Sequence, residues 1–407
     1  MKVVSTGLDN FKAGKLAGQK IGLVTNQTGL NRHYQRTAQV LTAAGVQVAA
    51  LFGPEHGYYG VEQDAIALQE TERDRWSGVP VYSLYRHKDD ERAGDSNPFG
   101  PPPGSLDGLD GLVFDIQDVG VRYYTYPTTL GILLEQADLP IYVIDRPNPI
   151  GGTIIEGPNL EPEFSSFVGR YPQIPVRHGL TLGELALFIN RYLLNGRAKL
   201  EVLKLDGWQR DMTWQETGLP WLATSPNLPA LSTARLYPGT CLIEGTNLSI
   251  GRGTAQPFEL IGAPWLTRPD RLAQELNRLA RPGLYFRDTF FKPSYDRFAG
   301  QVCGGVQVHL QPEDGQPEQK NGPAQIVRSG LHLVATLLKL YPENFGWLPA
   351  HFDRLIGSDK PRLHLTALAL GSEGQTWLEE LFEEWAIQEA HFTAQRQDIL
   401  LYGAETS

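Results

Sequence analysis

The segment GLVFDIQDVGVRYYTYPTTLGILLEQAD (111–138) combines a short apolar run, a polar stretch and a helical pattern. The run at 111–116 is too short for a helix and carries β-branched and aromatic residues, which predicts a buried strand. Residues 128–138 place apolar side chains three and four positions apart, which predicts a helix. A strand that leads through a polar loop into a helix is the repeating unit of an α/β sheet.

Similar apolar runs surround this unit, and they predict strands at 21–25, 46–52, 79–85, 141–145 and 200–205. Helical patterns occur between them at 34–45 and 181–194. Strands that alternate with helices indicate a parallel sheet with helices on both faces. The fold class we expect is therefore α/β, with a Rossmann-like, doubly wound, mostly parallel sheet.

The length of the chain predicts two domains. It has 407 residues, whereas single hydrophobic cores stop growing at about 250–300 residues. We place the sheet domain at 1–235 and a smaller α+β domain, which closes a cleft against it, at 236–407. The second domain opens with a Gly- and Pro-rich segment that carries large apolar side chains, which favours ordered loops over a flexible linker. Its predicted helices lie near 269–280, 324–340 and 374–398, and its predicted strands near 284–290 and 302–310.

Composition excludes several classes of protein. Hydrophobic residues make up 41% of the chain and charged residues 20%, as in ordinary globular proteins. The formal net charge is −10 and no basic run exceeds two residues, so nucleic acid is not an expected partner. Cys241 and Cys303 are the only cysteines. They cannot form a disulfide framework, and we expect both thiols to be free and buried.

The N-terminal segment MKVVSTGLDNFKAGKLAGQK (1–20) lacks the apolar core of a signal peptide. No apolar stretch elsewhere approaches the ~18 residues that suggest a membrane-spanning helix. These features lead us to expect a cytoplasmic protein without a membrane partner. The sequence leaves the oligomeric state open.

Motifs of several common α/β enzymes are missing. GxGxxG does not follow the first predicted strand, and neither GxxxxGK[ST] nor GxSxG occurs. These absences disfavour dinucleotide binding, nucleoside triphosphate binding and a serine hydrolase. The histidines show no HExxH or comparable spacing. We therefore expect neither a cofactor nor a metal.

Polar clusters follow each of the first five predicted strands. In chain order they are TNQTG, GPEHG, YRHKDDE, DIQDVGVRYYTY and DRPNPIGG. Ligands bind at the carboxyl ends of the strands in open parallel sheets, because the loops converge there around a crevice. The carboxylates, amides, tyrosines and arginines in these clusters suit a polyhydroxylated ligand.

Glu55 lies in the second cluster, on a turn restricted by Pro54 and flanked by glycines. A carboxylic acid held in this way can donate a proton to a leaving oxygen, which makes Glu55 a candidate catalytic acid. The alternative is a glutamate that pairs with a local donor in a structural turn. His56, the next residue, suits a structural or substrate-contact role better than metal binding.

The fourth cluster is the densest. Asp115 and Asp118 are candidate catalytic partners of Glu55, and Arg122 is suited either to hold an anion or to neutralise these aspartates. Its candidate substrate-binding tyrosines are Tyr123, Tyr124 and Tyr126. Each of these residues also has a structural interpretation, but the cluster as a whole favours a site.

Other loops contribute further candidates for substrate binding. They are Asn26 and Asn148, which follow predicted strands, and Glu244, Asn247 and Arg252, on a glycine-rich segment of the second domain. Glu184 is not among them, because it follows Thr181 at the spacing of a helix capping box.

Several motifs together resemble those of the exo-β-N-acetylmuramidase family. They are GLVTNQTG, FGPEHG, DIQDVGVRYYTYPTTL, DRPNPIGG, RHGLTLGELA and YPGTCLIEGTNLSIGRGTAQPFELIGAPW, which span residues 21–265 in order. The resemblance implies a Rossmann-like domain without nucleotide, a C-terminal domain and a site in the cleft between them. The reaction that it implies is release of N-acetylmuramic acid from the non-reducing end of peptidoglycan glycan fragments, with Glu55 as the catalytic glutamate.

Within that reaction, we expect Glu55 to act as general acid and Asp115 or Asp118 as its partner. Either aspartate can alternatively orient the 2-acetamido group of the substrate, which can serve as the nucleophile itself. Arg122 or Arg252 would hold the lactyl carboxylate. This sequence departs from the family where Tyr59 follows Tyr58, since an arginine is expected after the aromatic residue. Other readings are a non-catalytic muropeptide-binding protein or sensor, and an amidase or esterase that acts on muramyl compounds.

Overall fold

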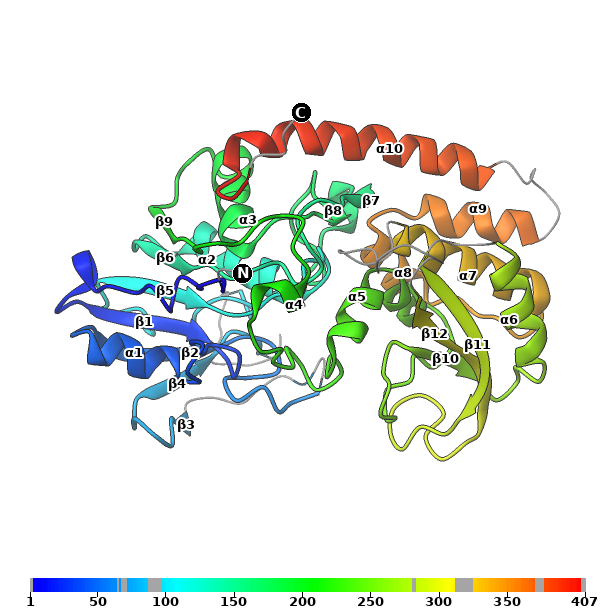
Figure 1. Cartoon of the computed structure of the whole chain (residues 1–407), viewed down its shortest axis with the longest axis horizontal. Helices are drawn as coiled ribbons and strands as arrows, with labels where there is room; N and C mark the ends of the chain where they lie inside the picture. The colour runs from blue at the N-terminus through cyan, green and yellow to red at the C-terminus, as the bar shows by residue number, and fades with distance from the viewer. Residues whose placement is uncertain are drawn as a thin grey trace.

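The computed structural model describes residues 3–63, 66, 72–86, 97–279, 283–311, 325–369 and 377–403. A seven-stranded sheet with its helices forms one part of the molecule, and a three-stranded sheet with helices forms the other. The long C-terminal helix α10 (Trp377–Arg396) lies across the top of both parts in Figure 1. This architecture confirms the expected α/β domain with a smaller α+β domain.

The larger sheet has the strand order β3-β4-β2-β1-β5-β6-β9. Its strands are β1 (Lys20–Thr25), β2 (Gln47–Gly53), β3 (Glu72–Arg73), β4 (Pro80–Ser83), β5 (Gly111–Asp115), β6 (Ile141–Ile144) and β9 (Leu200–Leu203). All neighbouring pairs are parallel except β3 with β4. The chain moves outward from β1 in one direction and from β5 in the other. The carboxyl ends of these two strands therefore form the switch point at which such sheets bind ligands.

Alternate residues of the central strands enter two separate cores. Leu112 and Phe114 of β5 pack on one face with residues of α2 (Thr125–Gln136) and α3 (Leu182–Phe188). Val113 points to the other face, where Leu41 of α1 (Thr37–Ala43) belongs to the same core. Helices thus cover both faces, which explains why these strands are apolar throughout rather than alternating.

Local signals predict the ends of some helices better than others. The capping box expected at α3 is present, since Glu184 N donates to Thr181 Oγ1 at 3.2 Å and Thr181 N donates to Glu184 Oε2 at 3.1 Å. Helix α2 begins at Thr125, ahead of the predicted residue 128, and Pro127 is accommodated in its first turn. After α3 the chain continues as a π-helical turn at Ile189–Leu193.

The second part contains an antiparallel sheet of order β10-β12-β11, formed by β10 (Leu260–Ala263), β11 (Leu284–Phe291) and β12 (Cys303–Leu310). Its helices are α5 (Leu231–Thr240), α6 (Pro269–Arg278), α7 (Ile326–Leu340), α8 (Pro349–Ile356), α9 (Lys360–Ala369) and α10. Strand β10 and helices α5, α8 and α9 lie outside the predicted elements. Helix α5 runs across residues 235 and 236, so the domain boundary placed there stays a prediction.

The remaining helices, strands and turns are short. They are the hairpin of β7 (Glu156–Asn159) and β8 (Pro175–Arg177), helix α4 (Trp214–Thr217), and 3₁₀ turns at Gly14–Leu16, Pro162–Phe164, Cys241–Gly245 and Gln397–Ile399. Within the described ranges no helix is long and apolar enough to cross a membrane. Cys241 and Cys303 are free and buried, as expected.

Helix α10 contacts strand β7, which lies far from it in the chain. The backbone nitrogen of Gly157 donates to Glu389 Oε1 at 2.9 Å, and that of Asn159 donates to Gln388 Oε1 at 2.8 Å. The last helix of the chain therefore accepts hydrogen bonds from backbone nitrogens of β7, in the part of the molecule that contains the seven-stranded sheet. Such contacts fix the position of one part against the other.

Candidate active site

A pocket of about 350 Å³ opens where the two parts of the molecule meet. This volume falls within the usual range of about 300–1,000 Å³ for small-molecule sites. Six of the predicted site residues line it, namely Glu55, His56, Tyr123, Tyr124, Glu244 and Arg252. The pocket is therefore formed by loops at the carboxyl edge of the large sheet and by residues of the second part, as the sequence predicts.

Glu55 is held on a tight turn directly after β2. A Cβ at Gly53 would lie 2.5 Å from the backbone nitrogen of Tyr58, so only glycine allows the chain to fold back this closely. His56 adopts a left-handed conformation with φ of 69°, and its Nδ1 lies 2.9 Å from the carbonyl oxygen of Glu62. A non-glycine residue in this region signals backbone strain, which is common at functional sites.

The Glu55 carboxylate receives a hydrogen bond from the first residue of α2. Thr125 Oγ1 donates to Glu55 Oε2 at 2.7 Å, and the Glu55 residue is 8% exposed. The turn after β2 and the start of α2 thus fix the carboxylate together while leaving it at the pocket surface. This geometry supports a functional role more than the alternative of a turn with purely local contacts.

Glu244 forms a charged cluster on the opposite part of the molecule. Arg252 donates to Glu244 Oε1 at 2.5 Å, and His351 Nε2 lies 3.4 Å from Glu244 Oε2. Burial by itself would raise the pKa of the Glu244 carboxyl, but the charges and hydrogen bonds of Arg252 and His351 outweigh burial and lower this pKa to about 2. Glu244 is therefore an ionised carboxylate at neutral pH.

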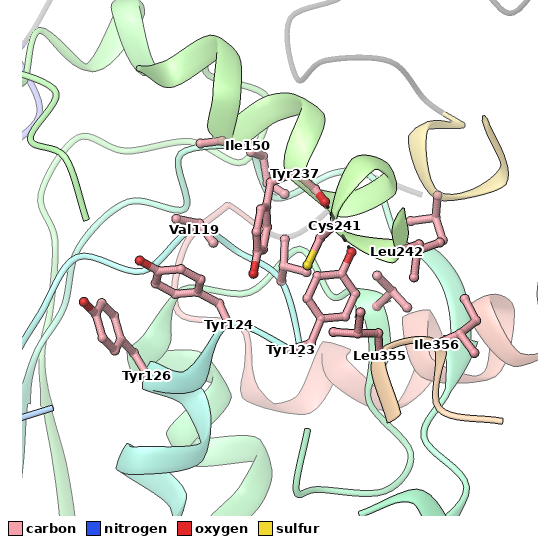
Figure 2. Packing of buried hydrophobic residues seen from close by; sticks show 14 of the residues in the cluster. Val119, Tyr123, Tyr124, Tyr126, Ile150, Tyr237, Cys241, Leu242, Leu355 and Ile356 are labelled. Atoms are coloured by element: carbon pink, nitrogen blue, oxygen red, sulfur yellow. Dashed lines mark hydrogen bonds between the residues drawn. The ribbon is translucent and has the colours of Figure 1, made fainter. Parts of the chain in front are cut away.

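Aromatic rings form two walls of the pocket. Phe99 and Phe167 stack with ring centroids 4.1 Å apart, and Tyr85 lies 5.2 Å from Phe167. Figure 2 shows the second wall, where Tyr237 of α5 packs near Tyr123 and Tyr124. Aromatic faces beside polar groups suit a ligand with both apolar and hydroxylated surfaces, such as a sugar.

Asp115 does not line the pocket, contrary to the expectation that it acts as a catalytic partner. It is fully buried, and Arg146 donates to its two oxygens at 2.6 and 2.9 Å. Thr37 of α1 donates to the same carboxylate. Asp115 ends β5 with its side chain directed to these groups, so it joins the sheet to α1 instead of facing a ligand.

Asp118 also lies outside the set of pocket residues. Its Oδ2 accepts a hydrogen bond from the backbone nitrogen of Gly120 at 2.7 Å, whereas its Oδ1 has no hydrogen-bond partner in the part of the chain that the structure describes. Burial raises the pKa of the Asp118 carboxyl to about 7, against the smaller opposing effect of backbone hydrogen bonds. The group is buried and does not line the pocket, so it is better suited to a structural role.

This raised pKa predicts how Asp118 affects stability. Because the folded state binds the proton more tightly than the unfolded chain, the stabilisation is present at low pH and is lost as the pH rises towards about 7. Asp118→Asn removes this titration. Between about pH 5 and pH 8, the free energy of unfolding of the variant relative to that of the original protein should rise by roughly 2–4 kcal/mol.

Urea unfolding at both pH values measures this difference. Asp288→Asn serves as the control, because it removes one negative charge from an exposed position on β11. A pH dependence that is the same in Asp118→Asn as in the original protein would contradict the assignment.

Arg122 is committed to backbone carbonyl groups. Its guanidinium donates to Pro158 O at 2.7 Å and Ile174 O at 2.9 Å, and to Leu355 O at 3.0 Å and Ile356 O at 2.8 Å. Leu355 and Ile356 end helix α8, so a cation there interacts favourably with the helix dipole. Arg122 therefore positions α8 rather than binding an anion in the pocket, and no aspartate within the described residues pairs with it.

The remaining predicted residues lie in structural networks outside the pocket lining. Asn26 Nδ2 donates to Tyr126 OH at 2.9 Å, and Tyr126 OH donates to Thr224 O at 2.7 Å. The side-chain amides of the other two asparagines bond to main-chain groups, Asn148 to Leu180 O at 2.9 Å and Asn247 to Asn344 O at 2.8 Å. These residues hold the loops around the site in place.

Sequence reasoning missed several lining residues, which include Tyr85, Phe99, Thr125, Phe167, Tyr237, His351 and Arg354. Tyr85, Thr125 and Tyr237 lie within motifs or clusters that the sequence singles out, so their neighbourhood offered a signal. His351 and Arg354 lie on α8, for which no motif was recognised. Part of the third polar cluster, residues 87–91, lies outside the described residues.

The fold and the pocket define an α/β protein with a carboxylate-bearing, aromatic-walled cleft, which is the type of site that glycosidases use. Two family models match the chain. The N-terminal model of the exo-β-N-acetylmuramidase NamZ matches residues 21–232, and the C-terminal model matches residues 235–402. The chain belongs to the exo-β-N-acetylmuramidase NamZ family. This membership confirms the family and the class of enzyme, a peptidoglycan glycosidase, that the sequence motifs indicate.

Individual relatives agree with the family models. The peptidoglycan β-N-acetylmuramidase NamZ of Bacillus subtilis is 40% identical over 409 residues, which cover 98% of this chain and 91% of the relative. Two solved structures from Bacteroides fragilis, each described as a DUF1343 family protein, share the fold. One is 32% identical with a TM-score of 0.83, and the match covers 98% of this chain and 99% of the chain in that structure. The other is 28% identical with a TM-score of 0.74, over 99% of both chains.

Proposed function

We propose that this protein hydrolyses the β-glycosidic bond of N-acetylmuramic acid at the non-reducing end of peptidoglycan glycan fragments. One observation carries the proposal: the Glu55 carboxylate lies in an aromatic-walled pocket between the two parts of a chain of this family. The Bacillus subtilis relative, which is named as a peptidoglycan β-N-acetylmuramidase, supports the same reaction.

Glu55 is the group that we assign as general acid. Its proton passes to the glycosidic oxygen as the bond to the anomeric carbon breaks, and water supplies the hydroxyl group that replaces the leaving sugar and the proton that restores the acid. The hydrogen bond from Thr125 to Oε2 orients the carboxyl group. Loss of the Glu55 carboxyl group should therefore reduce the rate of turnover strongly and the affinity for the substrate only slightly.

Glu244 is the second carboxylate of the pocket within the described residues. Because its pKa is lowered to about 2, it stays charged throughout the reaction and is a weak base. We assign it to accept hydrogen bonds from hydroxyl or amide groups of the sugar and to stabilise the positive charge of an oxocarbenium-like transition state. Glu244 thus takes the role of second carboxylate that we expected for Asp115 or Asp118.

A chromogenic assay tests the reaction and the sugar together. The protein should release nitrophenol from a nitrophenyl β-N-acetylmuraminide, and should release it much more slowly from the matching β-N-acetylglucosaminide. Saturable binding of the muraminide without product would indicate a sensor. Release of peptide instead of sugar from a muropeptide would indicate an amidase.

A further inference from the structure

Arg354 differs from Arg252 and His351, the charged or titratable groups that pair with Glu244 at the pocket. It lines the pocket and is exposed, and it makes no hydrogen bond or ion pair with any residue that the structure describes. Arg252, in contrast, donates to Glu244 at 2.5 Å. The pocket therefore presents a guanidinium group that is available to an anion.

Helix α8 holds Arg354 in a defined position. Arg362 of α9 donates to both oxygens of Asp353 at 2.8 and 2.7 Å, next to Arg354 in the chain. Arg122 donates to the last carbonyl groups of the same helix. His351 and Arg354 are three residues apart and so share a face, and both line the pocket. The backbone that carries Arg354 is therefore fixed at both neighbouring positions.

The chemistry of the substrate supplies a matching anion. N-acetylmuramic acid is N-acetylglucosamine with an added lactyl ether, and this ether ends in a carboxylate. Guanidinium groups bind carboxylates through two parallel hydrogen bonds, which gives both strength and direction. Arg122 is bonded to carbonyl groups and Arg252 faces Glu244, which would repel a second carboxylate.

We propose that Arg354 binds the lactyl carboxylate and determines the preference for N-acetylmuramic acid over N-acetylglucosamine. This inference rests on the proposed function. Arg354 replaces Arg122 and Arg252, which we expected from the sequence to hold the lactyl carboxylate. Arg354 acts on substrate recognition, and the proton transfer itself stays with Glu55.

Two substrates together measure the contribution of the lactyl carboxylate to recognition. One is the nitrophenyl β-N-acetylmuraminide, and the other is the same compound with the lactyl carboxylate converted to a carboxamide. For the original protein, kcat/KM on the acid should exceed that on the amide by roughly 10- to 100-fold, which is the usual effect of a charge-assisted hydrogen bond. Arg354→Gln should reduce this ratio towards one, and Arg354→Lys should restore part of it.

A binding measurement completes the test. Free N-acetylmuramic acid should bind Arg354→Gln more weakly by calorimetry, by a factor similar to the loss in the substrate ratio. Arg278→Gln is the matched control, because it removes an exposed arginine from α6, outside the pocket. An unchanged acid-to-amide ratio in a folded Arg354→Gln variant would overturn the inference. Failure of the original protein to cleave either muraminide would instead overturn the proposed function, and the inference with it.

Discussion

The Glu55→Gln variant should hydrolyse a β-N-acetylmuraminide at least about a hundredfold more slowly than the original protein. Glutamine has nearly the same shape and can still accept the hydrogen bond from Thr125 Oγ1, but its amide group is too weak an acid to transfer a proton to the leaving oxygen. The loss should therefore appear in kcat, with little change in thermal stability or in binding of N-acetylmuramic acid. Steady-state kinetics, calorimetry and thermal unfolding of the same preparation measure the three quantities.

Glu201→Gln provides the control for Glu55→Gln. Glu201 lies on β9 with a side chain that is 44% exposed and paired with Lys15, outside the pocket. Its substitution should leave kcat unchanged within error. Near-normal turnover in Glu55→Gln would remove Glu55 from the role of general acid and leave the pocket without its proposed proton donor.

Replacing Arg122 by methionine should lower the free energy of unfolding by about 3–5 kcal/mol, because buried acceptors lose their charged donor. The guanidinium donates to carbonyl groups of Pro158 and Ile174 as well as to those that end α8. Denaturant unfolding measures this loss. Arg122→Lys should recover only part of it, since an ammonium group keeps the charge without the planar fork of donors.

Arg170→Met is the matched control for Arg122→Met. Arg170 pairs with Glu135, and the two side chains are 37% and 21% exposed, so its loss should cost less than about 1 kcal/mol. The structural role assigned to Arg122 would be contradicted by a variant that unfolds like the original protein but no longer binds N-acetylmuramic acid. That result would return Arg122 to the substrate-binding role that its sequence motif indicates.

Much of the fold could be predicted because its signals are local. The apolar runs predict six strands of the large sheet, since strands buried on both faces need no polar alternation. The hairpin of β7 and β8 was not predicted, because EGPN and PVR are short and contain glycine or proline. Hydrogen bonds that the hairpin donates to distant acceptors, Gln388 and Glu389, help to stabilise it.

The site likewise contains residues that local sequence signals reveal and residues whose role depends on distant partners. Glu55 could be found because its flanking glycines and proline mark an unusual turn at the end of a strand. Asp115 ends a neighbouring strand and carries the same chemical group, yet Arg146 and Thr37 surround it. Nothing in the local sequence of Asp115 reveals these partners, which come from the loop after β6 and from α1.

The sequence by itself determined the strand pattern of the sheet, the edge at which a ligand would bind and the glutamate placed there, because hydrophobic periodicity and turn chemistry act over a few residues. Only the tertiary structure decided which charged side chains face the pocket. Burial and pairing depend on groups that are distant in the chain, so folding directs Arg122 to the end of α8 and leaves Arg354 unpaired among the described residues at the pocket.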